Sequence, residues 1–285
     1  MRLSENGFAP GPSGPGVLMS SLLLLAAPLF AAPLEAPGKN FKVEVVETST
    51  APGRTDYLLK FPSAVKSPWP ANDVVWAHLS VPDAARGKRG PAVLVLPVMA
   101  APNVWIETRF TERFARDGLA VMWLEMPTQF RRRPDPSQPS GQVFLGRTTA
   151  SLARNYRQSI LDARRALDVL SARPEADPGR VALFGISLGA LVGSMVYSLD
   201  ARPVFAVFLL GGADFPSLLM GSAMTGPFAR KLGLTVEDVR KALGRRKSAD
   251  PAAQERHHLR RHIVHSAFVA SNGVQAEVHE TLLQR

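Results

Sequence analysis

One serine in this chain is flanked by glycines at the spacing that nucleophilic chemistry requires. The segment "VALFGISLGALVG", residues 181–193, holds Gly185, Ser187 and Gly189 between two apolar runs. A hydroxyl that attacks a carbonyl carbon projects from a strand-to-helix turn so tight that the residues two before and two after it have no room for a β-carbon. The spacing therefore predicts a buried strand, a sharp turn with Ser187 as nucleophile, and a helix. The alternative is a glycine-lined helix start that only packs or binds an anion.

A serine hydroxyl becomes a useful nucleophile when a histidine accepts its proton and a carboxylate orients that histidine. Asp214 in "GGADF" follows an apolar run and is the candidate acid, although it could instead brace its own loop. No histidine is an equally good candidate for the base. His279 falls on an expected terminal helix and His78 on an expected strand, and we interpret the other four as surface or packing residues: His257, His258, His262 and His265.

The residue types argue against metal and thiol chemistry. The chain has no cysteine, which excludes disulfides, thiolate zinc ligands and cysteine nucleophiles. The histidines between 257 and 265 lack the helical HExxH spacing of a zinc site. We therefore expect neither a metal nor an organic cofactor.

The elements that must position these residues follow from hydrophobic patterning. Nearly continuous apolar runs are typical of strands buried on both faces of a parallel sheet, and they occur at 91–98, 119–125, 181–185 and 204–210. Alternating segments predict half-exposed strands at 41–48 and 73–81. Helices are predicted from apolar spacing at 105–118, 150–172 and 188–199. This alternation predicts an α/β fold with a doubly wound, mostly parallel sheet.

Together these segments resemble the α/β-hydrolase family, in particular bacterial esterase- or peptidase-like serine hydrolases. The resemblance extends from about residue 75 to about residue 243. It rests on four stretches that look like the third strand with its oxyanion loop, the fourth strand, the nucleophile elbow and the sixth strand: "VLVLPVMAAPN", "LAVMWLEMP", "VALFGISLGA" and "VFLLGGADFP". It also implies antiparallel edge strands within 41–81.

The resemblance implies the roles of individual residues. Ser187 would attack an ester or amide carbonyl, and the backbone N–H of Leu188 would be one oxyanion donor. The second donor would come from the loop after the third strand, at Met99 or Val98. The family commonly has His-Gly where this chain has Pro97 and Val98. A backbone donor tolerates that change, because no side chain supplies the hydrogen bond.

The C-terminal segment departs from the family pattern, in which the acid usually follows the seventh strand and the histidine follows the eighth. Residues 262–270 fit the seventh strand, but Ser271, Asn272 and Gly273 follow it and the sequence ends after a helix-like segment. We therefore interpret the sheet as lacking its last strand, through truncation, a frameshift or loss of catalysis. We expect weak or no hydrolysis, and self-association through the exposed sheet edge.

Two alternatives come from other classes of function. A non-catalytic, hydrolase-like binding protein would keep the pocket without a complete triad. A binder of anionic surfaces would use the net charge of +10 and the basic region around 240–261. The charge lacks interleaved aromatic residues, so we expect no nucleic-acid partner. The connection 126–150 contains Arg131, Arg132 and Arg133, which would either favour an acidic substrate or be solvated.

Residues 1–38 are interpreted as a leader. The apolar run within 17–38 is interrupted by Pro28 and Pro33 and is too short for a stable membrane span. It is similar to the apolar centre of a secretory signal, with cleavage near Ala31 or Ala32. We expect an exported protein, periplasmic or extracellular, whose α/β-hydrolase-like domain occupies 39–285. The alternative is a disordered apolar tail.

Overall fold

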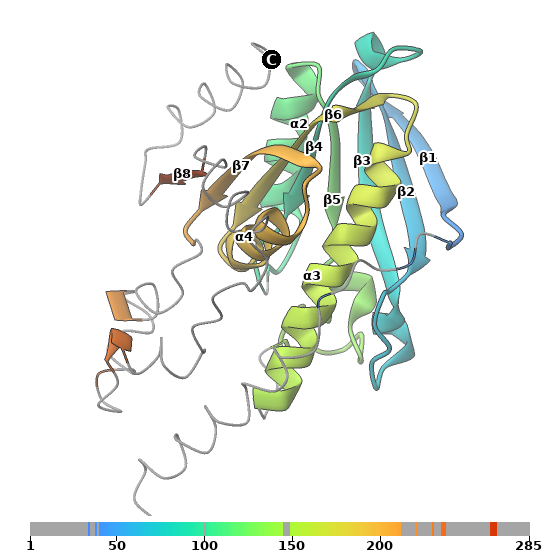
Figure 1. The fold of residues 1–285 in the computed structure, drawn as a ribbon. Coiled ribbons are helices and arrows are strands. Elements are labelled where there is room, and N and C mark those ends of the chain that lie inside the picture. The colour runs from blue at the N-terminus through green and yellow to red at the C-terminus, as the bar shows by residue number, and fades with distance from the viewer. Residues whose placement is uncertain are drawn as a thin grey trace, which may run out of the picture.

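A mixed sheet with helices on both faces forms the described part of the chain (Figure 1). The computed structural model describes residues 40–99, 101–144 and 149–211, together with 34, 38, 220–221, 230, 235–237 and 263–266. Within these residues the sheet has eight strands, in the order β1-β2-β3-β5-β4-β6-β7-β8. They are β1 Glu44–Ala51, β2 Arg54–Pro62, β3 Val74–Pro82, β4 Gly90–Leu96, β5 Ala120–Leu124, β6 Ala176–Ile186, β7 Pro203–Leu209 and β8 Ile263–Ser266.

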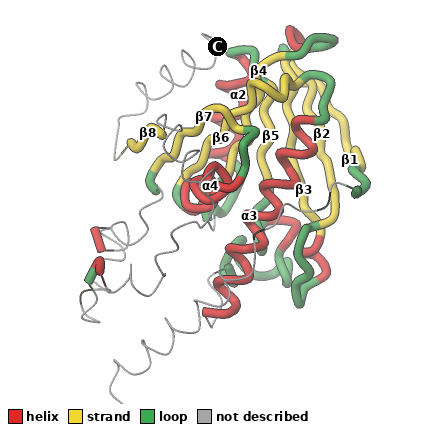
Figure 2. Tube along the Cα trace, viewed as in Figure 1, coloured by secondary structure: helices red, strands yellow, loops and turns green. Residues whose placement is uncertain are grey.

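The helices connect the strands in the manner the patterning predicts. The α-helices are α2 Trp105–Arg116, α3 Thr149–Ser171 and α4 Leu188–Leu199. Short 3-10 helices lie at η1 Pro70–Asp73, η2 Asp83–Ala85 and η3 Phe130–Arg132. Figure 2 shows α3 crossing the middle of the sheet, with α4 beside it. All three predicted helices are confirmed to within a residue or two at each end.

The second half of the sheet is parallel, as predicted. Strands β5, β4, β6, β7 and β8 pair in parallel. The chain passes from β4 to β5 on one side and then crosses to β6 on the other. At this switch the end of β4 lies beside the end of β6, with Leu96 opposite Gly185. Ligands of such sheets bind outside the carboxyl ends of the strands at a switch point, so this edge is where a site belongs.

The antiparallel edge contains a strand that was not predicted. β2 pairs with both β1 and β3, and the β1–β2 turn passes through Gly53 at φ 76°. The signal was present in the sequence: a Pro-Gly turn precedes alternating residues, of which Thr55, Leu59 and Phe61 are buried. The expected antiparallel edge is therefore confirmed, with one strand more.

Two apolar clusters fix the helices to opposite faces of the sheet. On one face Leu94 and Leu183 pack with the stripe of α3 and with α4, which is buried nearly all round. On the other face Phe184 packs against the α2 stripe, and its ring centroid lies 4.6 Å from that of Phe110 and 5.3 Å from that of Phe114. The faces that hydrophobic spacing assigned to α2 and α3 are thus the faces that the sheet buries.

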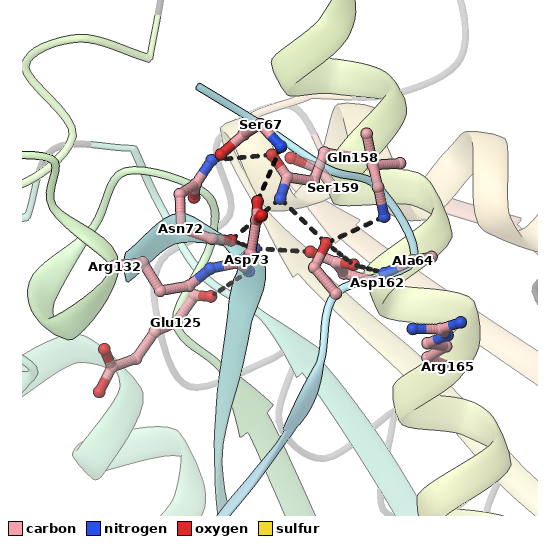
Figure 3. A network of polar contacts seen from close by, with 12 residues as sticks. Ala64, Ser67, Asn72, Asp73, Glu125, Arg132, Gln158, Ser159, Asp162 and Arg165 are labelled. Atoms are coloured by element: carbon pink, nitrogen blue, oxygen red, sulfur yellow. Dashed lines mark hydrogen bonds and ion pairs between the residues drawn. The ribbon is translucent and has the colours of Figure 1, made fainter. Parts of the chain in front are cut away.

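The connection after β5 is anchored by a buried polar network (Figure 3). Arg132 is fully buried, and its Nη2 donates to Asp162 Oδ2 on α3 at 2.7 Å and to the Asn72 carbonyl at 2.7 Å. Its Nη1 donates to the Glu125 carbonyl at 3.0 Å. Asp162 Oδ1 accepts from Ser63 Oγ at 2.7 Å. The network joins the β2–β3 connection, the segment after β5 and α3.

The arginines of this connection serve the fold. For Arg132 both expectations, recognition of an acidic substrate and solvation, are wrong, because it is buried and paired with Asp162. Arg131 pairs with Glu125 at 2.5 Å and lies over the Trp76 ring. Arg133 donates to carbonyl groups of its own loop. The three adjacent arginines therefore hold the segment after β5 in place.

Most of the expectations about the two ends of the chain concern residues outside the described ranges. Segment 262–270 contributes β8, which pairs in parallel with β7 as the predicted seventh family strand should. The expected lack of a further strand depends on residues after 266, and the expected leader lies mainly in residues 1–33. Neither segment is within the described ranges. Among the helices that are described, none has the length and apolar character needed to cross a bilayer.

Candidate functional site

Ser187 lies at the junction of β6 and α4 in a strained backbone conformation. Its φ is 52° and its ψ is −110°, which a non-glycine residue adopts only at a cost of about 1–3 kcal/mol. The surrounding structure fixes the turn: the Ser187 N–H donates to the Leu209 carbonyl at 2.8 Å, and its carbonyl accepts from Ala190 at 3.0 Å. The predicted strand, turn and helix are present, with a partly exposed Ser187 at the carboxyl edge.

The two flanking glycines make room for this turn. A β-carbon on Gly185 would lie 2.8 Å from the Ala190 nitrogen, and one on Gly189 would overlap the carbonyl of Leu96. The Gly189 N–H donates to the Pro97 carbonyl at 3.1 Å. The start of α4 therefore packs directly against the ends of β6 and β4, and a side chain at Gly185 would prevent the first contact and one at Gly189 the second.

Two successive carbonyl groups of the loop after β4 accept hydrogen bonds from different elements. The Pro97 carbonyl accepts from Gly189, and the Val98 carbonyl accepts from Gln129 Nε2 at 2.9 Å. The peptide bonds of the described residues are all trans. Met99, the next residue, is partly buried against the core. Leu188 opens α4, and the N–H groups of a first helical turn have no intrahelical acceptor.

A fully buried carboxyl group lies beneath this loop. Neither oxygen of Glu107, in the first turn of α2, makes a hydrogen bond with any of the described residues. Burial raises the pKa of Glu107 above its usual range, and the backbone N–H groups of Glu107 itself and of Val98 partly oppose that shift. The Pro97 carbonyl accepts from Gly189, so the N–H of Val98, in the same trans peptide group, points away from the start of α4.

His78 has a structural environment. Its imidazole stacks on Trp123 with ring centroids 3.8 Å apart, and its Nε2 lies 3.1 Å from Glu125 Oε1. It sits on β3, three strands from β6 in the sheet, so a lateral distance of about 14 Å separates it from the strand that carries Ser187. His78 therefore cannot act as the base for Ser187.

Glu125 follows β5 at the same edge as Ser187, but its carboxylate is occupied. Besides His78, the Arg131 N–H donates to Glu125 Oε2 at 2.8 Å and Arg131 Nη1 donates to Oε1 at 2.5 Å. The side chain is 1% exposed. It holds the segment after β5 in place.

Asp214, the predicted acid, falls outside the residues that are described. So do the histidines at 257, 258, 262 and 279, none of which was predicted as the base, and His265 lies on β8, of which only the backbone is described. Among the described residues no side chain is hydrogen-bonded to Ser187 Oγ. Within these same ranges no group of three or more potential metal ligands occurs.

A cavity of about 320 Å³ lies away from the serine, between α2 and the antiparallel strands. Its lining includes Arg54, His78 and Arg131. Arg54 pairs with Asp56 at 3.1 Å, and Arg131 with Glu125. Both arginines that line the cavity are thus already paired with carboxylates of the fold.

Two buried residues near the loop after β4 were missed in the sequence. Gln129 donates to the Val98 carbonyl of that loop, and Glu107 is buried in α2, the helix that follows the loop. A weak signal existed for each: Gln129 follows a strand at the edge where sites form, and Glu107 lies in the first turn of the helix that follows the loop after β4. Neither signal distinguishes a buried contact from a solvated side chain, so only the structure reveals them.

Comparison with known proteins identifies the fold. No family model matches the chain, and no curated protein matches it either. Acetyl xylan esterase from Paenibacillus sp. R4 aligns with a TM-score of 0.56 at 14% identity, over 94% of this chain and 93% of that one. Acetyl xylan esterase 1 from Thermoanaerobacterium sp. JW/SL YS485 aligns with a TM-score of 0.51 at 14% identity, over 93% and 92%.

A third structure, a candidate acetyl xylan esterase from Bacteroides fragilis, gives a TM-score of 0.51 at 15% identity. The match covers 66% of this chain and 51% of that one, so this chain spans about half of its length. These similarities confirm the resemblance to α/β-hydrolases at the level of the fold.

Proposed function

We propose that this protein is a serine esterase that cleaves small carboxylic esters through Ser187. The observation that carries the proposal is the positive φ of Ser187 at the β6–α4 junction. The turn around this residue packs through Gly189 against the backbone at the end of β4. The fold shared with acetyl xylan esterases supports esters as the substrate class. Acetyl esters are accordingly the first substrates to test.

In the proposed reaction Ser187 Oγ bonds to the ester carbonyl carbon while its proton passes to a base. The carbonyl electrons move onto oxygen, and the resulting oxyanion accepts hydrogen bonds from the N–H groups of Leu188 and Met99. Collapse of this intermediate breaks the bond to the leaving alcohol, which takes the proton. Water then repeats the attack on the acyl-serine and releases the acid. Loss of one oxyanion donor typically lowers kcat by about a hundredfold or more.

Of the two residues predicted to supply the second donor, Met99 fits the proposal better than Val98. The Pro97 carbonyl accepts from Gly189, so the Val98 N–H of the same peptide group points away from the turn around Ser187. The Val98 carbonyl is instead held by Gln129, so the Met99 N–H points away from Gln129. Asp214 is retained as the proposed acid. We expect slow turnover, because in the described part of the chain no histidine side chain is hydrogen-bonded to Ser187 Oγ.

The test is hydrolysis of p-nitrophenyl acetate by the full chain and by two serine variants. Ser187→Ala should remove all turnover above background. Ser198→Ala removes an exposed hydroxyl of the same helix, which donates only to the Met195 carbonyl, and should leave the rate unchanged. Turnover that survives Ser187→Ala would assign the chemistry to another residue. A complete lack of turnover in the unmodified chain would favour the non-catalytic binding protein.

We also propose that the protein is exported and that copies of it associate. The apolar run within 17–38 supports export, and the edge of the sheet at β8 supports pairing between copies. Expression with a C-terminal tag, followed by cell fractionation and sizing of the recovered protein, tests both. A product retained at full length in the cytoplasm would count against export, and a monomer at high concentration would count against pairing.

A further inference from the structure

Gln129 is a fully buried amide held in place by an unusual stretch of backbone. Its neighbours Thr128 and Phe130 both have positive φ, 67° and 43°, which is strained for side chains of their size. Hydrogen bonds fix both: the Thr128 N–H donates to Asn72 Oδ1 at 2.9 Å, and the Phe130 N–H donates to Ser140 Oγ at 3.2 Å. Backbone strain of this kind persists where the surrounding structure over-determines it, often at a functional site.

The strained segment directs the Gln129 side chain at the loop after β4. Its Nε2 donates to the Val98 carbonyl at 2.9 Å. A carbonyl accepts only from a donor, so the amide nitrogen must face Val98. The Oε1 atom is buried and makes no hydrogen bond among the described residues. Within the described ranges, the one hydrogen bond of this side chain therefore goes to the loop after β4.

That hydrogen bond fixes the orientation of the Val98–Met99 peptide group. In a trans peptide the C=O and the following N–H point in opposite directions. Holding the Val98 carbonyl toward Gln129 therefore turns the Met99 N–H away from Gln129. The preceding peptide group is fixed as well, because the Pro97 carbonyl accepts from Gly189 beside Ser187. The loop is thus attached to the turn at one peptide group and oriented by Gln129 at the next.

We propose that Gln129 is a positioning residue of the esterase, which holds the Val98–Met99 peptide so that the Met99 N–H faces the oxyanion formed at Ser187. The inference rests on the proposed function. Gln129 itself touches neither substrate nor nucleophile. Its role is to keep a backbone donor in the orientation that the transition state needs, which is the condition for electrostatic stabilisation by a preformed oxyanion hole.

The kinetic test uses Gln129→Met, which keeps the length of the side chain and removes the donor. For p-nitrophenyl acetate, kcat should fall at least about tenfold, short of the roughly hundredfold to thousandfold loss that accompanies complete removal of an oxyanion donor. KM should stay nearly constant, because the contact is made in the transition state. Gln129→Leu, which also has no side-chain donor, should behave in the same way and serves if the first variant does not fold.

The matched control is Asn155→Leu. Asn155 is another fully buried amide that donates to a loop carbonyl, that of Phe144 at 2.7 Å, and its Oδ1 is also without a partner among the described residues. It holds the far end of the same connection. If Asn155→Leu lowers kcat as much as Gln129→Met does, Gln129 only stabilises the connection and the proposal is wrong.

A second readout observes the peptide group directly. Val-Met pairs occur twice in the sequence, at 98–99 and 121–122. A protein carrying ¹³C at the valine carbonyl and ¹⁵N in methionine therefore gives two signals in a spectrum that selects linked carbonyl and amide nuclei. In Gln129→Met the Val98–Met99 signal should move, and the Val121–Met122 signal, from the interior of β5, should not.

The outcomes separate the two proposals. If the unmodified protein hydrolyses the ester and the Val98–Met99 signal moves while kcat is unchanged, the role of Gln129 is wrong and the esterase stands. If that signal does not move, Gln129 does not hold the peptide group. If the unmodified protein neither hydrolyses esters nor reacts at Ser187, the proposed function fails, and the positioning role fails with it.

Discussion

At the scale of the residue, strained backbone gathers at one edge of the sheet. Four non-glycine residues have positive φ among those described: Thr128, Phe130, Ser187 and Leu210. They follow β5, β6 and β7, and so lie at the carboxyl ends of parallel strands. Strain in these positions is offset by packing and hydrogen bonds elsewhere, which is the pattern of a site whose geometry matters more than its local stability.

Glu107 provides a residue-scale prediction. Burial raises the pKa of Glu107, so above about pH 4.5 the unfolded chain loses this proton before the folded protein does. Stability is therefore lost as the pH rises from 4.5 toward the folded pKa. Glu107→Gln cannot ionise. Its melting temperature should match that of the unmodified protein near pH 4.5 and exceed it at pH 8, whereas parallel curves would show that the carboxyl is not perturbed.

The sequence predicts the turn around Ser187 because its glycines report a local steric requirement. Gly185 and Gly189 sit where a β-carbon would meet the backbone of α4 or β4. It does not predict the role of Gln129, whose partner is a backbone carbonyl of a loop about 30 residues away in the chain, or the burial of Glu107. No spacing rule encodes such contacts, and both residue types are ordinary on a surface.

At the scale of the element, the segment after β5 is held by buried charge. Arg132 and Asp162 are 0% and 1% exposed, and each also bonds to polar groups of the β2–β3 connection. The apolar stripe of α3 predicted which face of the helix packs on the sheet. It gave no sign that Asp162, a charged residue within the helix, is also buried.

Asp162→Ala should destabilise the fold by about 3–5 kcal/mol, because it leaves the Arg132 guanidinium buried without its partner. Urea unfolding at neutral pH measures the loss. Asp83→Ala, which removes a half-exposed partner of Arg86, is the control and should change stability by less than about 1 kcal/mol. Equal effects of the two substitutions would contradict the structural role given to the Arg132–Asp162 pair.

At the scale of the whole molecule, a second ionic cluster joins α3, α4 and β7. Arg202 donates to Asp168 on α3 and to Asp200 at the end of α4, and Arg164 donates to Asp200 at 3.2 Å. Burial alone would raise the pKa of Asp200, but the hydrogen bonds and charge of Arg202, with a hydrogen bond from Arg164, lower it to about 2. The Asp200 carboxylate thus links α3 and α4 to the start of β7.

This cluster predicts how the protein responds to acid. The ordinary pKa of an aspartate is 3.8, so as the pH falls below it the unfolded chain binds a proton before folded Asp200 does. The stabilisation, on the order of 2 kcal/mol, is present above pH 4 and is lost between about pH 4 and pH 2. Asp200→Asn should be less stable than the unmodified protein at pH 6, and this difference should shrink at pH 3. A difference that does not change between these pH values would contradict the account.

The order of the elements was predictable because each apolar run and helical stripe is long and periodic. β2 was missed because its outward residues are charged and its inward residues are few, so the alternation is weak in the sequence. The interior arginine network was missed for a different reason. Burial of Arg132 depends on partners from three separate segments.

The central claim is that Ser187 is a nucleophile, and covalent labelling tests it most directly. The full chain is incubated with a fluorophosphonate, and the modified residue is located by mass spectrometry. The account predicts a single adduct at Ser187, present in Ser198→Ala and absent from Ser187→Ala. Prolonged incubation that leaves Ser187 unmodified, or an adduct on another residue, would contradict it.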